Sequence, residues 1–144
     1  MLILNHSGRP HLRIHSPPAY HLTCRQLTQL QMDPNGVLLH NAPVDKLILV
    51  VRIIEARKGT SPRGLPVTFL HLEDSTGRCR VTLYDQNVEK GDYYKITVSA
   101  RISGPVYKQE IKLQSFGIVP LHHYSDLTEH FLECMKSQLL LTSI

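Results

Sequence analysis

The sequence predicts an all-β domain, a small barrel or sandwich, with a helix on either side of it. After one short run, five runs of apolar or alternating residues of ordinary strand length are separated by short segments rich in Gly, Pro, Asp and Asn, which is the spacing of strands and turns. Helix-capping patterns stand before and after this series. The chain has 144 residues, of which 42% are hydrophobic, so it is long enough for one domain with one core.

The region before the strands combines an irregular arm with a short helix. Residues 1–21 show no periodicity and include three prolines and four histidines, so we expect an extended N-terminal arm. Thr23 and Gln26 have the spacing of a capping box, which predicts that a helix begins there. The residues Asp33-Pro34-Asn35-Gly36 favour a turn, and the helix should end before it.

The strand series starts with a short run at 37–40 and a nearly all-apolar run at 46–54, which should face protein on both sides. Residues 56–66 combine glycines, a proline and cations, so we expect them to form a loop. The later strands are predicted at 67–72, 78–84, 93–102 and 108–119. In the strand at 93–102, the residues that share one face are Tyr94, Ile96, Val98, Ala100 and Ile102.

The last predicted element is an amphipathic helix that begins near Asp126 and Glu129, which have a capping pattern. Its apolar stripe is wide enough either to pack against partner helices or to plug the chain's own barrel. We therefore divide the chain into an extended arm (1–21), a barrel with its short helix (22–124) and a C-terminal oligomerisation helix (125–144). The side chains of the stripe are Leu127, Phe131, Leu132, Met135 and Leu139.

Composition argues against several classes of protein. The longest apolar run, 47–51, is far shorter than the ~20 residues that span a bilayer, and the N-terminus lacks the pattern of a signal peptide. The three cysteines show no pairing rhythm, which fits a reducing compartment, and no C-x-x-C motif points to structural zinc. The net charge of +4 permits a polyanionic partner without requiring one.

The sequence contains no nucleophile elbow, phosphate-binding glycine loop, dinucleotide fingerprint or zinc-protease helix. His122 and His123 are adjacent and would point in different directions on a strand, so we interpret them as solvated loop residues. Glu73 and Asp74 precede a Ser-Thr-Gly turn, which favours turn capping over acid–base catalysis. We therefore expect no enzyme activity, no metal or other cofactor and no small-molecule substrate.

The candidate functional residues are cations that lie close to aromatic rings. On the strand at 78–84, alternation places Arg80, Thr82 and Tyr84 on the face that points away from the core. A guanidinium and a ring on one exposed face suit a single-stranded nucleic acid, because the ring stacks on a base and the cation meets a phosphate. Further candidates are Tyr107 with Lys108 at a turn, and the cations of the predicted loop, Arg57, Lys58 and Arg63.

Several segments, taken in order, resemble a known family. They include the capped helix at 23–27, FLHLEDSTG at 69–77, RVTLYD at 80–85, FGIVPL at 116–121 and LTEHFLE at 127–133. Over roughly residues 20–140 the chain is similar to the OB-fold domain of the middle subunit of replication protein A, and to its relatives in telomeric and meiotic complexes. A strand that ends in Ile-x-Pro-Leu directly before an amphipathic helix is more particular to this subunit than the turn motif, which recurs across OB domains.

The resemblance implies a five-stranded OB-fold barrel that holds single-stranded DNA in a groove. It implies stacking rings at the end of strand three and between strands four and five, where this chain has Tyr84 and Tyr107 in place of the family's Trp and Phe. It also implies that the C-terminal helix joins a three-helix bundle with a large and a small OB-fold subunit. Such a protein would be a non-catalytic nuclear subunit in DNA replication, repair, recombination or telomere maintenance.

The chain departs from this family at both ends. A His/Pro arm stands where the family has a Ser/Gly-rich tail, and no counterpart of the family's winged-helix domain follows Ile144, which fits a specialised telomeric or meiotic relative.

Two alternative functions stay open. The modest charge and the absence of Trp fit a structural assembly subunit that does not touch nucleic acid, and the same sheet face suits an RNA-binding OB domain.

Overall fold

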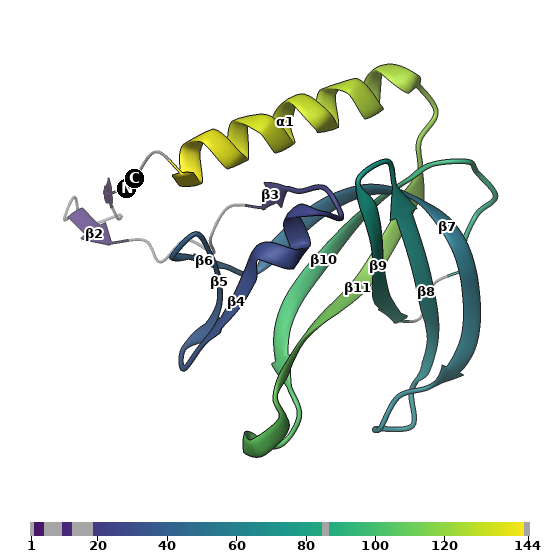
Figure 1. Ribbon diagram of the computed structural model, residues 1–144, viewed down its shortest axis with the longest axis horizontal. Coiled ribbons are helices and arrows are strands. Elements are labelled where there is room, and N and C mark those ends of the chain that lie inside the picture. The colour runs from purple at the N-terminus through teal and green to yellow at the C-terminus, as the bar shows by residue number, and fades with distance from the viewer. Residues whose placement is uncertain (1, 5–9, 13–18, 85–86, 143–144) are drawn as a thin grey trace.

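The chain folds into a closed five-stranded barrel with one helix at its C-terminal end (Figure 1). The computed structural model describes residues 2–4, 10–12, 19–84 and 87–142. Barrel strands are joined in the order β7-β8-β9-β11-β10, and β10 pairs back onto β7 to close the cylinder. All neighbours are antiparallel except β9 and β11. The strands are β7 (Lys46–Thr60), β8 (Pro66–Asp74), β9 (Gly77–Tyr84), β10 (Tyr94–Ser103) and β11 (Glu110–Pro120).

This topology is the OB-fold, so the predicted fold class is confirmed. The core is formed by the inward side chains of all five strands, as the period of two requires. In β10 the alternation predicted from the sequence is present, since Tyr94, Ile96, Val98 and Ala100 are buried and the residues between them are not. In β9, Val81 and Leu83 are likewise buried.

Strand β7 is longer than predicted, and the expected loop at 56–66 is wrong for its first half. Residues 56–60 continue the strand and pair with residues 66–70 of β8. Cross-strand hydrogen bonding therefore overrides the local Gly and cation signal, and only residues 61–65 form the hairpin tip. There the Ser61 N–H donates to the Leu65 carbonyl at 2.8 Å, and Gly64 adopts a positive φ of 80°.

The segment before the barrel contains the predicted capping box. The Gln26 N–H donates to the Thr23 hydroxyl at 3.2 Å, and the Thr23 N–H donates to the Gln26 side-chain oxygen at 2.8 Å. The helix that follows, η1 (Gln26–Gln29), is one 3₁₀ turn and is shorter than expected. The next residues form a three-stranded meander through the predicted Asp33–Gly36 turn: β4 (Leu30–Asp33), β5 (Gly36–Leu39) and β6 (Ala42–Val44).

The predicted arm meets the barrel earlier than residue 21. Tyr20 and His21 form β3 (Tyr20–His21), which pairs parallel to β7. Further upstream, β1 (Leu2–Leu4) pairs antiparallel with β2 (Pro10–Leu12). The rest of the arm, at 1, 5–9 and 13–18, lies outside the described residues.

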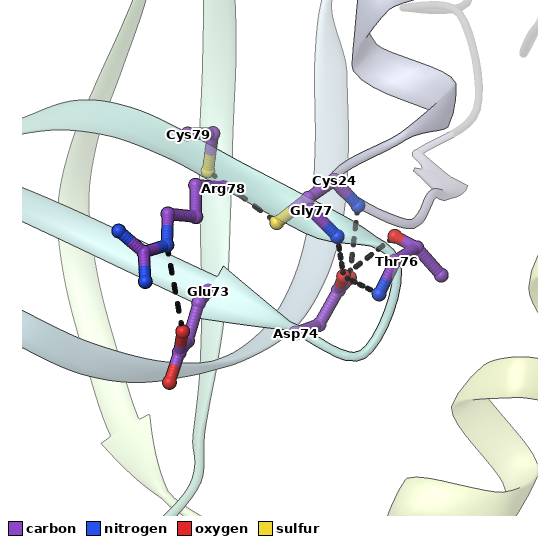
Figure 2. Close-up of polar contacts among 7 residues, drawn as sticks. All are labelled: Cys24, Glu73, Asp74, Thr76, Gly77, Arg78 and Cys79. Atoms are coloured by element: carbon purple, nitrogen blue, oxygen red, sulfur yellow. Dashed lines mark hydrogen bonds and ion pairs between the residues drawn. The ribbon is translucent and has the colours of Figure 1, made fainter.

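The turn between β8 and β9 shows what Asp74 does (Figure 2). Its carboxylate accepts hydrogen bonds from the N–H groups of Thr76 (2.8 Å), Gly77 (3.1 Å) and Cys24 (2.8 Å). The last of these ties the N-terminal segment to the barrel. Glu73 instead lies 3.7 Å from Arg78 in an exposed ion pair. The two carboxylates therefore have separate structural partners, as the turn-capping interpretation predicts.

Helix α1 (Tyr124–Thr142) lies across β3 and the adjoining part of β7 (Figure 1). It begins two residues before Asp126, which therefore sits inside the first turn. The side chains that face the barrel are small or polar, namely His130, Cys134 and Ser137. Of the predicted apolar stripe, Leu132, Met135 and Leu139 are exposed, so this part of the stripe does not plug the chain's own barrel. No helix in the described part of the chain is long and apolar enough to cross a bilayer.

Candidate nucleic-acid interface

An open groove of about 780 Å³ runs over the outer face of the barrel, across β7, β8, β9 and the start of β11. Strand register explains why these side chains meet. Arg57 of β7 is opposite Phe69 of β8, and Phe69 is in turn opposite Thr82 of β9. Directly opposite residues of antiparallel strands share a face, so the polar and aromatic side chains line up across three strands. The lining includes Arg57, Phe69, His71, Arg80, Thr82 and Lys112.

Phe69 contributes a phenyl ring to the lining of this groove. Its ring is partly exposed and lies over Gly59, where a β-carbon would collide with it. The guanidinium carbon of Arg57 lies 5.7 Å from the centroid of the ring. This cation–π contact holds the guanidinium beside an aromatic surface, which is an arrangement that suits contact with a base and a phosphate.

The charge in the groove is mixed. Three cations, Arg57, Arg80 and Lys112, share the lining with the carboxylates of Glu55 and Glu110. One of these carboxylates is partly neutralised, because Lys112 Nζ lies 3.6 Å from Glu110 Oε1. The groove therefore offers a few phosphate contacts rather than a strongly basic channel.

The two predicted stacking rings lie beside the groove rather than in its lining. Tyr84 ends β9, two residues beyond Thr82 on the same face, and its ring stacks on Phe116 with centroids 5.2 Å apart. Tyr107 lies in η2 (Val106–Lys108), at the tip of the β10–β11 hairpin, and is 90% exposed. In Figure 1 this tip and the β7–β8 hairpin tip project from the same end of the barrel.

The predicted cations lie in three places: the groove lining, the other face of β7 and the tips of two hairpins. Arg57 and Arg80 line the groove together with Thr82. Lys58, the next residue on β7, alternates to the other face of the strand and does not line it. Arg63 lies in the β7–β8 hairpin tip, and Lys108 lies in η2. These last two residues are therefore placed at the ends of the two projecting hairpins.

Sequence reasoning missed Phe69, His71, Lys112 and Phe116. The signal for the first two was available, because strand 67–72 alternates and its outward residues are Phe69 and His71. Lys112 and Phe116 belong to β11, whose neighbour β9 is not its neighbour in sequence. Their positions depend on how the barrel closes, which local patterns do not specify.

A second cavity, of about 710 Å³, lies between α1 and the barrel and contains a histidine pair. His21 Nδ1 and His130 Nδ1 are 3.0 Å apart, and His130 Nε2 lies 3.4 Å from Cys134 Sγ. Burial lowers the pKa of His130 to about 4 and raises the pKa of the Cys134 thiol to about 12. Among the residues that the structure describes, no three His, Cys, Asp or Glu side chains are grouped to hold a metal ion.

The apolar stripe of α1 remains open to solvent over most of its length. Met135 is 63% exposed, and Leu132 and Leu139 are also exposed. Leu127 and Phe131 are half-buried at the start of the helix. Because a single chain leaves this stripe uncovered, it has the character of an interaction surface.

The closed barrel and its groove define the chain as an OB-fold protein. No family model matches its sequence, and no curated protein sequence matches it. Several solved structures, in contrast, are similar to this chain in fold. A chain of a replication protein A heterotrimer bound to single-stranded DNA has a TM-score of 0.67 at 16% identity, over 87% of this chain and 98% of that one.

Two further structures show the same fold. A chain of yeast replication protein A bound to single-stranded DNA has a TM-score of 0.66 at 20% identity, over 89% of this chain and 95% of that one. A chain of the S. pombe Stn1–Ten1 complex has a TM-score of 0.70 at 13% identity, over 88% and 96%. The resemblance found in the sequence therefore holds for the fold.

Proposed function

We propose that this chain is a non-catalytic OB-fold subunit of a complex that binds single-stranded DNA. The observation that carries the proposal is the groove in which Arg57, Phe69 and Arg80 present cations and an aromatic ring on one face. Similar chains occur in structures of replication protein A bound to single-stranded DNA and of the Stn1–Ten1 complex, which supports the same role.

In the proposed mechanism, bases stack on exposed rings while phosphates meet the nearby cations. Tyr84 and Tyr107 supply aromatic rings at either side of the groove. Each stacked base contributes about 1–3 kcal/mol, so one barrel with a few rings binds weakly alone. Tight binding would come from linked OB domains that raise the effective concentration of each site. The proposed phosphate contacts come from Arg57 and Arg80 in the groove and from Arg63 and Lys108 at the hairpin tips. Lys58, a candidate from the sequence, lies on the other face of β7 and is left out of this mechanism.

The exposed stripe of α1 is the proposed surface for a large and a small OB-fold subunit. The exposed apolar side chains of this stripe are Leu132, Met135 and Leu139. They are spaced as in a coiled coil, which suits packing against partner helices. A complex of this kind acts on nuclear DNA during replication, repair, recombination, meiosis or telomere maintenance. We propose the nucleus as the location for that reason.

The test is the affinity of the full chain for a fluorescent 30-nucleotide oligo(dT), measured by anisotropy at fixed salt. Combined Arg57→Ala and Arg80→Ala should weaken binding at least about tenfold, because two phosphate contacts are lost. Arg101→Ala is the matched control, since Arg101 is an exposed cation of β10 that pairs with Asp45 at 3.8 Å, away from the groove. Equal affinities for wild type and the double variant would contradict the proposal.

A structural assembly subunit without nucleic-acid contact is the second candidate. It is favoured by the mixed charge of the groove and the open stripe of α1. The same titration separates the two functions, because an assembly subunit would leave oligo(dT) free at every concentration. A matched oligo(U) titration shows whether the barrel prefers RNA.

A further inference from the structure

Phe116 occupies a β-bulge on β11. The pairing of β10 with β11 places Thr97 opposite Gly117 and Val98 opposite Ser115, so Phe116 is the extra residue that opposes no partner. Bulges re-aim a side chain away from the regular pleat, and they are frequent next to binding sites. The position of this ring is therefore set by backbone geometry.

The bulge is held in place by a buried side chain. Ser115 is 1% exposed, and its hydroxyl lies 2.6 Å from the carbonyl oxygen of Thr97 and 2.9 Å from that of Gly117. The same hydroxyl accepts a hydrogen bond from the Gly117 N–H at 3.2 Å. Three contacts to the backbone on both strands thus fix the local turn that presents Phe116.

The bulge leaves the ring of Phe116 facing solvent, while the ring of Tyr84 packs against it. Phe116 is 66% exposed, and its ring stacks on Tyr84 at an interplanar angle of 23°. The register of β9 and β11, with Thr82 opposite Gln114, brings the two rings together. The Tyr84 hydroxyl lies 3.5 Å from Gln114 Nε2, which also limits the movement of the tyrosine.

We propose that Phe116 is a stacking platform for an unpaired nucleobase and that Tyr84 is the ring that backs it. This inference rests on the proposed function and adds a subsite to it. Arg80 and Tyr84 are four residues apart on one face of β9, or about 13 Å. A strand that meets the cations of the groove therefore reaches the ring pair without leaving this face.

The ring pair also changes the role expected for Tyr84. From the sequence, Tyr84 alone is the stacking residue at the end of this strand. In the structure one side of its ring is covered by Phe116, and Phe116 is the more exposed of the two. An unpaired base is the occupant that fits this ring, because any of the four bases can stack on a flat aromatic ring. The neighbouring cations can then contact the phosphates of the same strand.

The test uses the full chain and the same 30-nucleotide oligo(dT), with Phe116→Leu and Phe116→Trp. Phe116→Leu keeps an apolar side chain but removes the ring, and it should weaken binding about fivefold or more. Phe116→Trp should bind as tightly as wild type or more tightly. Val119→Ala is the control, since Val119 is another exposed apolar residue of β11, and its affinity should not change. Thermal unfolding of each variant checks that the barrel is intact.

The outcomes separate this inference from the proposed function. If wild type binds and the Arg57→Ala, Arg80→Ala variant is weakened, but Phe116→Leu binds as wild type does, the stacking role of Phe116 is overturned and the groove stands. If wild type does not bind, both fail. An oligonucleotide carrying 2-aminopurine gives a second readout, because quenching of the base by stacking should be present in wild type and lost in Phe116→Leu.

Discussion

At the scale of single residues, Asp74 illustrates how a carboxylate with a catalytic appearance serves the fold. Three backbone N–H groups, from two separate segments, donate to it (Figure 2). Removing the acceptor leaves those donors unpaired, and a charged acceptor contributes more than a neutral one.

We therefore expect Asp74→Ala to lower the free energy of unfolding by about 2–3 kcal/mol, measured by urea denaturation. Glu73→Ala is the neighbouring control and should cost less than about 1 kcal/mol, because its ion pair with Arg78 is exposed. Equal losses for the two variants would mean that the hydrogen bonds of Asp74 do not anchor the N-terminal segment.

The histidine pair under α1 makes stability depend on pH. His130 is 1% exposed, and burial followed by the nearby His21 lowers its pKa to about 4 from an ordinary 6.5. Lys95 lowers this pKa further, whereas Asp74 opposes the shift. The unfolded chain binds a proton at this histidine near pH 6.5, whereas the folded chain binds it only near pH 4. The contribution of neutral His130 to the free energy of unfolding is therefore fully present above pH 6.5 and is lost as the pH falls toward 4.

The expected loss between pH 7 and pH 4.5 is on the order of 2 kcal/mol in the free energy of unfolding, measured by urea denaturation at both pH values. His130→Gln should flatten the dependence, whereas His122→Gln, which changes an exposed histidine, should leave it unchanged. A wild-type chain whose stability is the same at both pH values would contradict a buried neutral His130.

The residue scale also shows what local pattern can and cannot predict. Arg80, Thr82 and Tyr84 were predictable because β9 is a regular strand in which the period of two holds throughout. Phe116 was not, because its direction depends on hydrogen bonds between Ser115 and a strand 18 residues away. The sequence identifies Arg57 as a candidate cation but predicts a loop there, whereas Arg57 lies in β7.

At the scale of elements, α1 has two functional sides. Its barrel side carries small and polar groups such as Cys134, and its outer side carries the apolar stripe. A helix whose apolar side faces solvent makes few apolar contacts with its own barrel. That side is therefore available for packing against partner chains.

We expect the combined Met135→Glu and Leu139→Glu variant to keep the melting temperature of the isolated chain within a few degrees of wild type, while partner subunits no longer co-purify. Both side chains are exposed, so the charges cost the monomer little. Cys134→Glu is the contrasting variant on the same helix and should lower the melting temperature strongly, because it buries a charge. Partners that still co-purify with the double variant would remove the stripe from assembly.

Element boundaries explain most of the remaining differences between prediction and structure. The helix expected to reach the turn at 33–36 gives way to β4, because Leu30 and Met32 pair with β5 across that turn. β7 likewise extends to Thr60 through its pairing with β8. In both cases a cross-strand partner supplies hydrogen bonds that a local propensity does not include.

At the scale of the whole molecule, the residues alone left a barrel and a sandwich equally open, and only the family resemblance favoured the barrel. Closure depends on the pairing of β10 with β7, at 94–99 and 46–51, which is remote in sequence. That closure brings β9 beside β11 and so creates the face that holds both the groove and the ring pair.

The most direct test of this account maps where a single strand touches the chain. In a titration of the ¹⁵N-labelled full chain with a 12-nucleotide oligo(dT), we expect the largest amide shift changes at Arg57, Phe69, Arg80, Tyr84 and Phe116, with the outer side of α1 unaffected. Shift changes confined to α1, or none at saturating oligonucleotide, would contradict a nucleic-acid interface on this face of the barrel.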